Sequence, residues 1–211
     1  AGCIFRCSHL TKLTLDFNDI EECGPYLGDM TRLKQMSLNK NQIARIDDSV
    51  GMLQSLVHLF VSDNRLTSIP DTFSMLVSLK TFNATRNQLS VFPKILCFTV
   101  SLQRLLLSSN PFALIDDYIG NLTSLVDLDI EKCPVTEIPA SFSLLPKLKS
   151  ATVWDAYRFV IPSQSIVVEG MGAIQNYLGK FYMALTKKSL DIASLKLKAF
   201  PIELIQRPEY A

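Results

Sequence analysis

The chain has 211 residues, of which 48% are hydrophobic and 19% are charged. This composition is ordinary for a folded globular protein and argues against intrinsic disorder. Because 21 basic residues nearly balance 20 acidic ones, there is no global basic field to drive nonspecific nucleic-acid binding, and we expect no nucleic-acid partner. No signal peptide is visible and no apolar run approaches the roughly 20 residues of a membrane span, so we expect no membrane partner.

Leucine recurs every 23 residues in seven consecutive registers without an insertion, at Leu10, Leu33, Leu56, Leu79, Leu102, Leu125 and Leu148. We number the places of this frame from that leucine. Further apolar residues stand at the fourth, sixth and eleventh places, Asn stands at the ninth, and Ile or Phe, often followed by Pro, stands at the fourteenth. Such self-similarity predicts a repeat architecture, in which stacked units build one continuous core.

Each unit is predicted to form one short strand and a return segment. Residues 56–64, LVHLFVSDN, alternate apolar and polar side chains, which is the period of a strand with one buried face. Residues 65–76, RLTSIPDTFSML, have wider apolar spacing and a proline that ends the strand, so the chain returns by a turn and a helical or extended segment. Stacked units then add parallel strands at intervals of about 4.8 Å. The predicted fold class is α/β.

The ninth-place asparagines Asn18, Asn41, Asn64, Asn87 and Asn110 predict a ladder of inward amides. Where the chain leaves the strand its backbone groups lose sheet partners, and an amide can satisfy them in unit after unit. Cys133 takes this place in the sixth unit, where a thiol substitutes only in part, and Ala156 takes it in the seventh, where we expect the ladder to end.

The repeated pattern L-x-x-L-x-L-x-x-N-x-L-x-x-I-P-x-x-F-x-x-L, which covers about residues 1–162, resembles the leucine-rich repeat family. The short unit with Ile-Pro or Phe-Pro, as in TSIPDTF, SVFPKIL and TEIPASF, is similar to intracellular members such as Ras-pathway scaffolds and the arrays that precede GTPase domains in Roco proteins. The resemblance implies a curved solenoid with the strands on its concave side, and protein binding as the usual activity. It also favours a cytoplasmic scaffold in signalling.

The predicted organisation has three parts. Residues 1–162 form the array, which begins inside a partial unit, so we expect at least one more unit or a cap before Ala1. Residues 163–188 form a linker and an amphipathic capping helix over about 168–187, because the apolar spacing there is 3, 4, 3 and 4, at Met171, Ile174, Leu178, Phe181 and Leu185. Residues 189–211 resume the frame and are predicted to begin a further, truncated unit.

The five cysteines favour reduced thiols in a cytosolic compartment. Cys23 stands at an inward place and is expected to be a small buried hydrophobe. Cys3 and Cys7 could form a terminal metal site or a disulfide, although C-x3-C alone is a weak signal. Asn83 and Asn121 head glycosylation acceptor patterns, which matter only if the chain is secreted.

The third, fifth, seventh and eighth places are predicted to face the concave groove. Most residues there are small or polar, but Phe60 and Leu106 are apolar and stand on either side of Asn83. Exposed aromatic and arginine residues in a cluster are typical of binding hot spots. The candidate protein-binding patch therefore comprises His58, Phe60, Asn83, Arg86, Arg104 and Leu106. The alternative is that Phe60 and Leu106 merely cover the sheet.

An acidic strip is predicted further along the same face, beside Trp154. Its members are Asp127, Asp129, Glu131 and Asp155. Like charges on adjacent strands repel, so such a strip is tolerated more easily if a basic partner meets it. Two alternatives stay open: the strip is a solvated face, and Trp154 packs under the capping helix.

The sequence offers no catalytic motif. The two histidines, His9 and His58, have no serine or cysteine paired to them by a recognisable pattern, and neither a zinc-protease motif nor a phosphate-binding loop occurs. We therefore expect no enzyme, cofactor or metal, and predict a non-catalytic module that binds another protein on its concave face. The alternatives are a regulatory region of a Roco-type enzyme, a structural subunit of a large assembly, and a receptor ectodomain. The partner and the oligomeric state are not set by the repeat frame.

Overall fold

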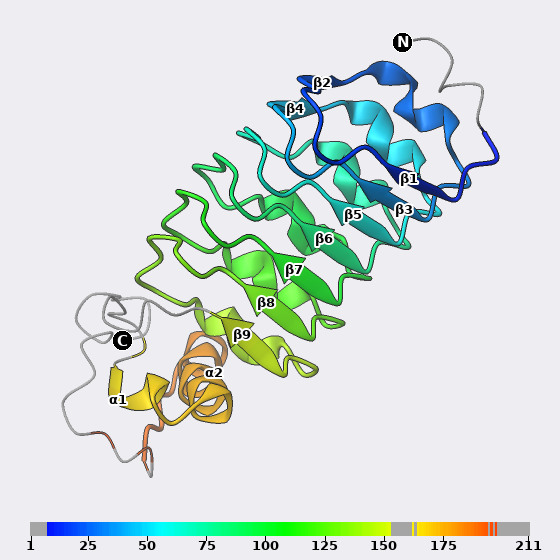
Figure 1. Ribbon diagram of the computed structural model, residues 1–211. Helices are drawn as coiled ribbons and strands as arrows, with labels where there is room; N and C mark the ends of the chain where they lie inside the picture. The colour runs from blue at the N-terminus through cyan, green and yellow to red at the C-terminus, as the bar shows by residue number, and fades with distance from the viewer. Residues whose placement is uncertain (1–7, 153–161, 163, 194, 196, 198–211) are drawn as a thin grey trace.

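The structure, a computed structural model, describes residues 8–152, 162, 164–193, 195 and 197 (Figure 1). Within these residues, seven short strands form one parallel sheet with the strands in chain order. Each strand pairs with the next in register, as Lys12 with Gln35 and His58 with Thr81, so the prediction of one strand per unit is confirmed. The strands are β1 (Lys12–Thr14), β3 (Gln35–Ser37), β5 (His58–Phe60), β6 (Thr81–Asn83), β7 (Arg104–Leu106), β8 (Asp127–Asp129) and β9 (Ser150–Thr152).

The central residue of each strand explains why the sheet forms. It stands at the fourth place of the frame and is buried from β3 to β9, as at Met36, Leu59 and Phe82. Its two neighbours, at the third and fifth places, therefore point to the opposite face of the sheet. These two rows of side chains line the concave side of the solenoid.

The return segments are short 3-10 helices on the convex side (Figure 1). The fifteenth place is the N-cap of each of them. In two units it is an aspartate that caps by its side chain: Asp47 accepts a hydrogen bond from the Ser49 N–H at 2.9 Å, and Asp116 accepts one from the Tyr118 N–H at 2.9 Å. The six helices of the described residues are Pro25–Asp29, Asp48–Met52, Asp71–Met75, Lys94–Phe98, Asp117–Asn121 and Ala140–Leu144. A two-residue strand pair, β2 (Glu22–Cys23) with β4 (Arg45–Ile46), lies along one edge of the array.

The asparagine ladder is confirmed. Asn64 Nδ2 donates to the carbonyls of Leu38, Val61 and Ser62 at 2.9, 3.1 and 3.1 Å, and its Oδ1 accepts from the Ile43 N–H at 3.0 Å. Asn41, Asn87 and Asn110 repeat this pattern, whereas Asn18 in the first unit is exposed and bonds only within its own turn. The Cys133 thiol substitutes in part, since its Sγ donates to Leu107 O at 3.3 Å. Ala156 lies outside the described residues.

The eighth place has a conformation that the sequence did not predict. Its residues have φ between 52° and 60° although none of them is glycine: Phe17, Lys40, Asp63, Arg86, Ser109 and Lys132. A left-handed residue three places after the end of the strand turns the chain so that the ninth-place amide points inward. At Lys40, Asp63, Arg86 and Ser109 the next residue is a ladder asparagine, whose inward bonds hold this unfavourable backbone in place.

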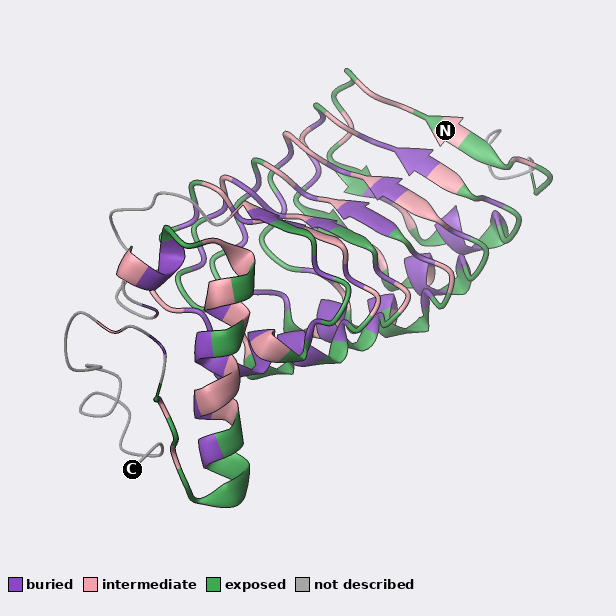
Figure 2. Cartoon of the chain, turned by 90° about the horizontal axis from the view of Figure 1, so that it is seen from below, coloured by how far each residue is buried: buried purple, intermediate pink, exposed green. Residues whose placement is uncertain are grey.

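The array ends under two helices, α1 (Gln164–Val167) and α2 (Met171–Lys187) (Figures 1 and 2). The capping role predicted for the second helix is confirmed by its contact with Ala140–Leu144 and by the 3.0 Å hydrogen bond from Gln175 Nε2 to Leu145 O. α2 begins at Met171, three residues later than predicted, because Gly170 has φ of 94°.

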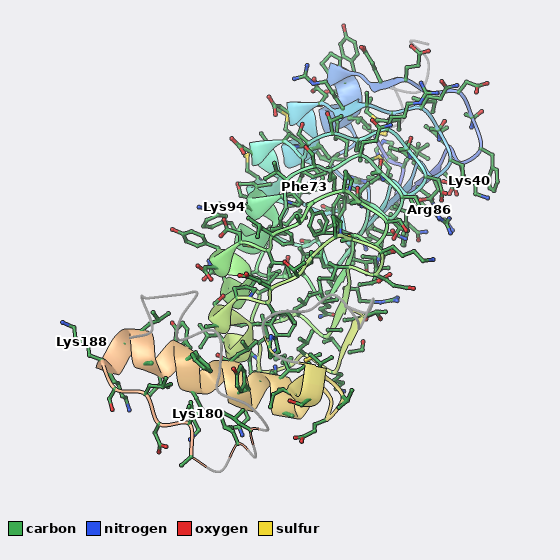
Figure 3. All side chains as sticks on the ribbon, turned by 90° about the vertical axis from the view of Figure 1, so that its left-hand side faces the viewer. Lys40, Phe73, Arg86, Lys94, Lys180 and Lys188 are labelled. Carbon is green, nitrogen blue, oxygen red and sulfur yellow. The ribbon has the colours of Figure 1, made fainter. Side chains whose placement is uncertain are left out.

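The prediction that Leu185 belongs to the buried stripe of α2 is wrong. Leu185 is 44% exposed, because the last turn, which ends beside Lys188, projects beyond the array (Figure 3). The buried face consists of Ile174, Tyr177, Leu178, Phe181 and Ala184. Beyond the helix, Leu195 is buried and Leu190, Ile192 and Leu197 pack against the core. Most of residues 189–211 lie outside the described ones, so the further repeat unit stays a prediction.

Candidate functional site

The structure brings together the three residues at the centre of the predicted patch. Phe60, Asn83 and Leu106 stand at the fifth place of β5, β6 and β7, and each is the direct register partner of the next. Adjacent parallel strands lie about 4.8 Å apart, so the two apolar side chains are separated by about 10 Å with the amide between them. Both are half-buried, because side chains of the neighbouring strands cover their flanks.

His58 extends the apolar surface along β5. Its ring stacks with that of Phe60, with 6.3 Å between the ring centroids and 11° between the ring planes. Third-place and fifth-place residues of one strand point to the same face, which is why this contact forms. The pair gives a flat aromatic surface on the concave side.

Asn83 keeps one polar group open. Its Oδ1 accepts a hydrogen bond from the Thr85 N–H at 3.0 Å. Its Nδ2 donates no hydrogen bond to any residue in the described part of the chain. A fixed acceptor and an open donor leave this amide ready to bind a carbonyl that approaches between Phe60 and Leu106.

The two predicted arginines are held by carboxylates of the same chain. Arg104 Nε lies 3.2 Å from Asp127 Oδ2, and Arg86 Nη1 lies 3.0 Å from Asp63 Oδ1. Both guanidinium side chains are more than half exposed, so each pair contributes little to stability. The arginines border the patch, but the charge of each is compensated by its own aspartate, so neither offers a partner an unpaired positive charge.

The same pairing shortens the predicted acidic strip. Asp127 forms an ion pair with Arg104 and also accepts a hydrogen bond from Ser150 Oγ at 2.6 Å, so its charge is compensated within the chain. The Asp129 carboxylate accepts one hydrogen bond, from the Glu131 N–H at 3.1 Å. Within the described residues, neither the Asp129 carboxylate nor the Glu131 carboxylate forms an ion pair. The open carboxylate of Asp129 thus lies next to Leu106, its register partner, and Glu131 follows two residues later in the chain. Trp154 and Asp155 lie outside the described residues.

Nearer the N-terminus, four concave-face residues form a hydrogen-bonded network with one another. Asp16 accepts from Ser37 Oγ and from the Asn39 N–H, both at 2.7 Å. Asn39 Oδ1 in turn accepts from Ser62 N at 2.8 Å and Ser62 Oγ at 2.7 Å. Polar groups that already bind one another have less to gain from a partner. This network therefore offers a partner less than the open Asn83 donor and the Asp129 carboxylate do.

Sequence reasoning missed an apolar ridge on the convex side. Its exposed side chains follow the 3-10 helices and are Met52, Met75, Val77, Phe98, Val100, Tyr118 and Leu144. The rings of Phe98 and Tyr118 are 5.4 Å apart, and Lys94 Nζ lies 4.1 Å from the Tyr118 ring, on the opposite edge from Lys40 and Arg86 (Figure 3). The signal was available, because the twentieth place of the frame carries Met52, Met75, Phe98 and Leu144.

The described residues contain no group of three His, Cys, Asp or Glu side chains that could hold a metal ion. Burial raises the pKa of Cys23 to about 11, of Cys97 to about 12 and of Cys133 to about 11. A thiol with such a pKa stays protonated near neutral pH and is a poor nucleophile and metal ligand. Cys3 and Cys7 lie outside the described residues. Within the described part of the chain, no helix has the length and apolar character needed to cross a bilayer.

Comparison with known proteins agrees with this geometry. Residues 31–89 match a family model described as leucine-rich repeat. The described array is a leucine-rich repeat solenoid. The leucine-rich repeat fold is a binding-type domain whose members typically mediate protein–protein interactions. A comparison with curated protein sequences gives no match.

Solved structures of leucine-rich repeat proteins resemble this chain over about 70% of its length. A leucine-rich repeat protein of Leptospira interrogans is 27% identical over 72% of the chain, with a TM-score of 0.70. An internalin of Listeria monocytogenes is 25% identical over 72%, with a TM-score of 0.60. A plant peptide hormone receptor, RGFR1 in complex with RGF2, is 28% identical over 69%, with a TM-score of 0.63. The matches cover 39%, 50% and 24% of those proteins, so the chain spans half or less of their length.

Proposed function

We propose that this leucine-rich repeat array binds another protein on its concave face, as a non-catalytic module of a cytoplasmic scaffold. The observation that carries the proposal is the row Phe60, Asn83 and Leu106, in which two half-buried apolar side chains flank an open amide donor. Because apolar side chains and an unpaired donor lie side by side in this row, a partner gains there from both desolvation and hydrogen bonding. The binding site comprises the row together with His58, Asp129 and Glu131.

Free, buried thiols support the cytoplasmic part of the proposal. Cys23, Cys97 and Cys133 are unpaired and buried. Free thiols persist in a reducing compartment, whereas secreted proteins tend to pair their cysteines. The similarity to short intracellular repeats with Ile-Pro points the same way.

The test is affinity capture from a lysate of the source cells, with the parent chain beside a Phe60→Asp, Leu106→Asp double variant. A Val91→Asp, Leu114→Asp variant is the matched control, because it adds the same two charges at exposed apolar side chains away from the strands. Circular dichroism and thermal unfolding verify that all three chains fold. We expect a protein that the parent and the control retain and the double variant loses; retention by all three chains contradicts the proposal.

A second candidate function is ligand binding by an extracellular receptor region. Two observations favour it: the similarity to a plant peptide hormone receptor, and the exposure of Asn121 at the end of a 3-10 helix, where it heads the acceptor pattern Asn-Leu-Thr. Mass-spectrometric peptide mapping of the chain purified from its source decides between the two. A glycan on Asn121 supports the receptor, and an unmodified Asn121 with free thiols supports the scaffold.

A further inference from the structure

The open groups of the concave site have a fixed order across the sheet. Phe60 is followed by the Asn83 donor, then by Leu106, then by Asp129, each on the next strand. The steps are about 4.8 Å, so the apolar side chains are about 9.6 Å apart and the carboxylate lies about 4.8 Å beyond the second one. A ligand that uses all four groups must therefore run perpendicular to the strands.

The spacing discriminates between ligand conformations. An extended β-strand presents side chains on one face about every 6.6 Å, so one step falls short of a separation of about 9.6 Å and two steps, about 13 Å, exceed it. A polyproline II helix rises about 3.1 Å per residue with three residues per turn, so residues i and i+3 share a face at about 9.3 Å. Of these two extended conformations, only polyproline II places side chains of consecutive turns against Phe60 and Leu106.

The donor between the apolar side chains favours the same conformation. An α-helix uses its carbonyl groups in internal hydrogen bonds, whereas a polyproline II backbone has none and its carbonyls are free to accept. The open Asn83 Nδ2 can donate to such a carbonyl midway between the two contacts. The stacked rings of His58 and Phe60 supply a flat aromatic surface, which is the kind of surface on which proline-rich segments dock.

The geometry points to a proline-rich segment in the polyproline II conformation as the ligand of this site, with apolar residues at i and i+3 and a Lys or Arg two residues later. The inference rests on the proposed function and names the partner's chemistry. The basic residue meets Asp129 and Glu131, the two carboxylates that no cation of the described residues neutralises. Because a polyproline II helix looks similar from either end, these charges also fix the direction in which it binds.

The test measures the fluorescence anisotropy of labelled peptides on titration with the full 211-residue chain. The probe is Gly-Leu-Pro-Pro-Leu-Pro-Arg-Gly. One control peptide, Gly-Leu-Pro-Leu-Pro-Pro-Arg-Gly, has the same composition with the leucines two residues apart, and a second, Gly-Leu-Thr-Val-Leu-Thr-Arg-Gly, keeps the spacing without proline. Losing one apolar contact is expected to weaken binding about tenfold. We therefore expect the chain to bind the probe roughly tenfold more tightly than it binds either control peptide.

Two variants of the chain test the polar contacts. Asn83→Ala removes the donor and is expected to weaken the probe about fivefold. Asp129→Asn with Glu131→Gln is expected to weaken it about fivefold as well, and to leave unchanged a peptide with norleucine in place of arginine. A merely structural role of these residues would not make the loss depend on the peptide's arginine.

The outcomes separate this inference from the proposed function. A preference for the three-residue spacing that depends on Asn83 supports the inference. Equal binding of all peptides, or binding of none, overturns it. If the lysate partner still depends on Phe60 and Leu106 in that case, the concave site stands and only the polyproline II ligand is wrong; if no partner depends on them, both proposals fail.

Discussion

Replacing Asn64 with alanine tests whether the asparagine ladder holds the array together. Asn64 is buried, and its amide makes four hydrogen bonds: Nδ2 donates to three carbonyls at 2.9, 3.1 and 3.1 Å, and Oδ1 accepts from Ile43 N at 3.0 Å. Two of these bonds, to Leu38 O and from Ile43 N, reach the preceding unit. The substitution therefore removes contacts both within a turn and between units.

The magnitude follows from the number of groups left without partners. A net hydrogen bond contributes about 1 kcal/mol, and a buried group left unsatisfied costs about 1–3 kcal/mol. Nδ2 has two hydrogens for its three carbonyl partners, so at least one hydrogen is shared between two of them. The lost free energy is therefore smaller than that of four full hydrogen bonds. We expect Asn64→Ala to lower the free energy of unfolding by about 3–4 kcal/mol.

The assay is urea denaturation followed by circular dichroism, with Asn18→Ala as the matched control. Asn18 occupies the same place of the frame, but it is exposed and makes two hydrogen bonds, to Leu15 O and Asp16 O, within its own turn. We expect the control to lose about 1 kcal/mol. Equal losses for the two variants would refute the reasoning, because burial and the bonds between units would then add nothing.

Two further predictions concern close packing and a buried thiol. Gly51→Ala places a Cβ 2.7 Å from Thr72 Cβ and 2.8 Å from its carbonyl oxygen, so we expect a loss of about 1–3 kcal/mol; Gly172→Ala in α2 meets nothing within 4 Å and should gain about 0.5–1 kcal/mol, both read from thermal unfolding. The reasoning requires Gly51→Ala to lower the unfolding temperature and Gly172→Ala to raise it. Burial raises the pKa of Cys97 to about 12, whereas the thiol of the unfolded chain has a pKa of about 8.5. The unfolded chain therefore loses its proton first, and the free energy of unfolding falls as the pH rises from about 8.5 toward 12. Between pH 8.5 and 10.5, Cys97→Ala should abolish about 1–2 kcal/mol of that alkaline loss in urea denaturation, and an unchanged pH dependence would contradict the burial of the thiol.

Much of the fold was predictable because the frame repeats. The leucines at the first place and the asparagines at the ninth define strand, turn and stacking direction in unit after unit, so an error in one unit is corrected by its neighbours. Leu185 shows where this help ends. The capping helix occurs once, and the apolar spacing predicts which stripe is buried but not how far along the helix the array extends.

The sequence predicted which residues of the candidate site are neighbours, but it did not predict which of its charged and polar groups are paired. Phe60, Asn83 and Leu106 fall at one place of the frame, so their adjacency follows from the register. The pairing of Arg104 with Asp127 depends on side-chain rotamers, and it changed which acids are open. The open donor of Asn83 likewise follows from a local bond to Thr85 that the frame does not specify.

The sequence by itself determined the solenoid, the register of its strands and the row of residues that face the groove, because a strict period in apolar side chains admits one way of stacking. Only the tertiary structure decided which polar groups on that face remain open, which face of α2 is covered, and that the eighth place adopts a left-handed backbone at residues such as Phe17 and Arg86. The physical reason is that burial follows from the pattern of one unit, whereas hydrogen bonds and ion pairs depend on distances of a few ångströms between side chains of different units.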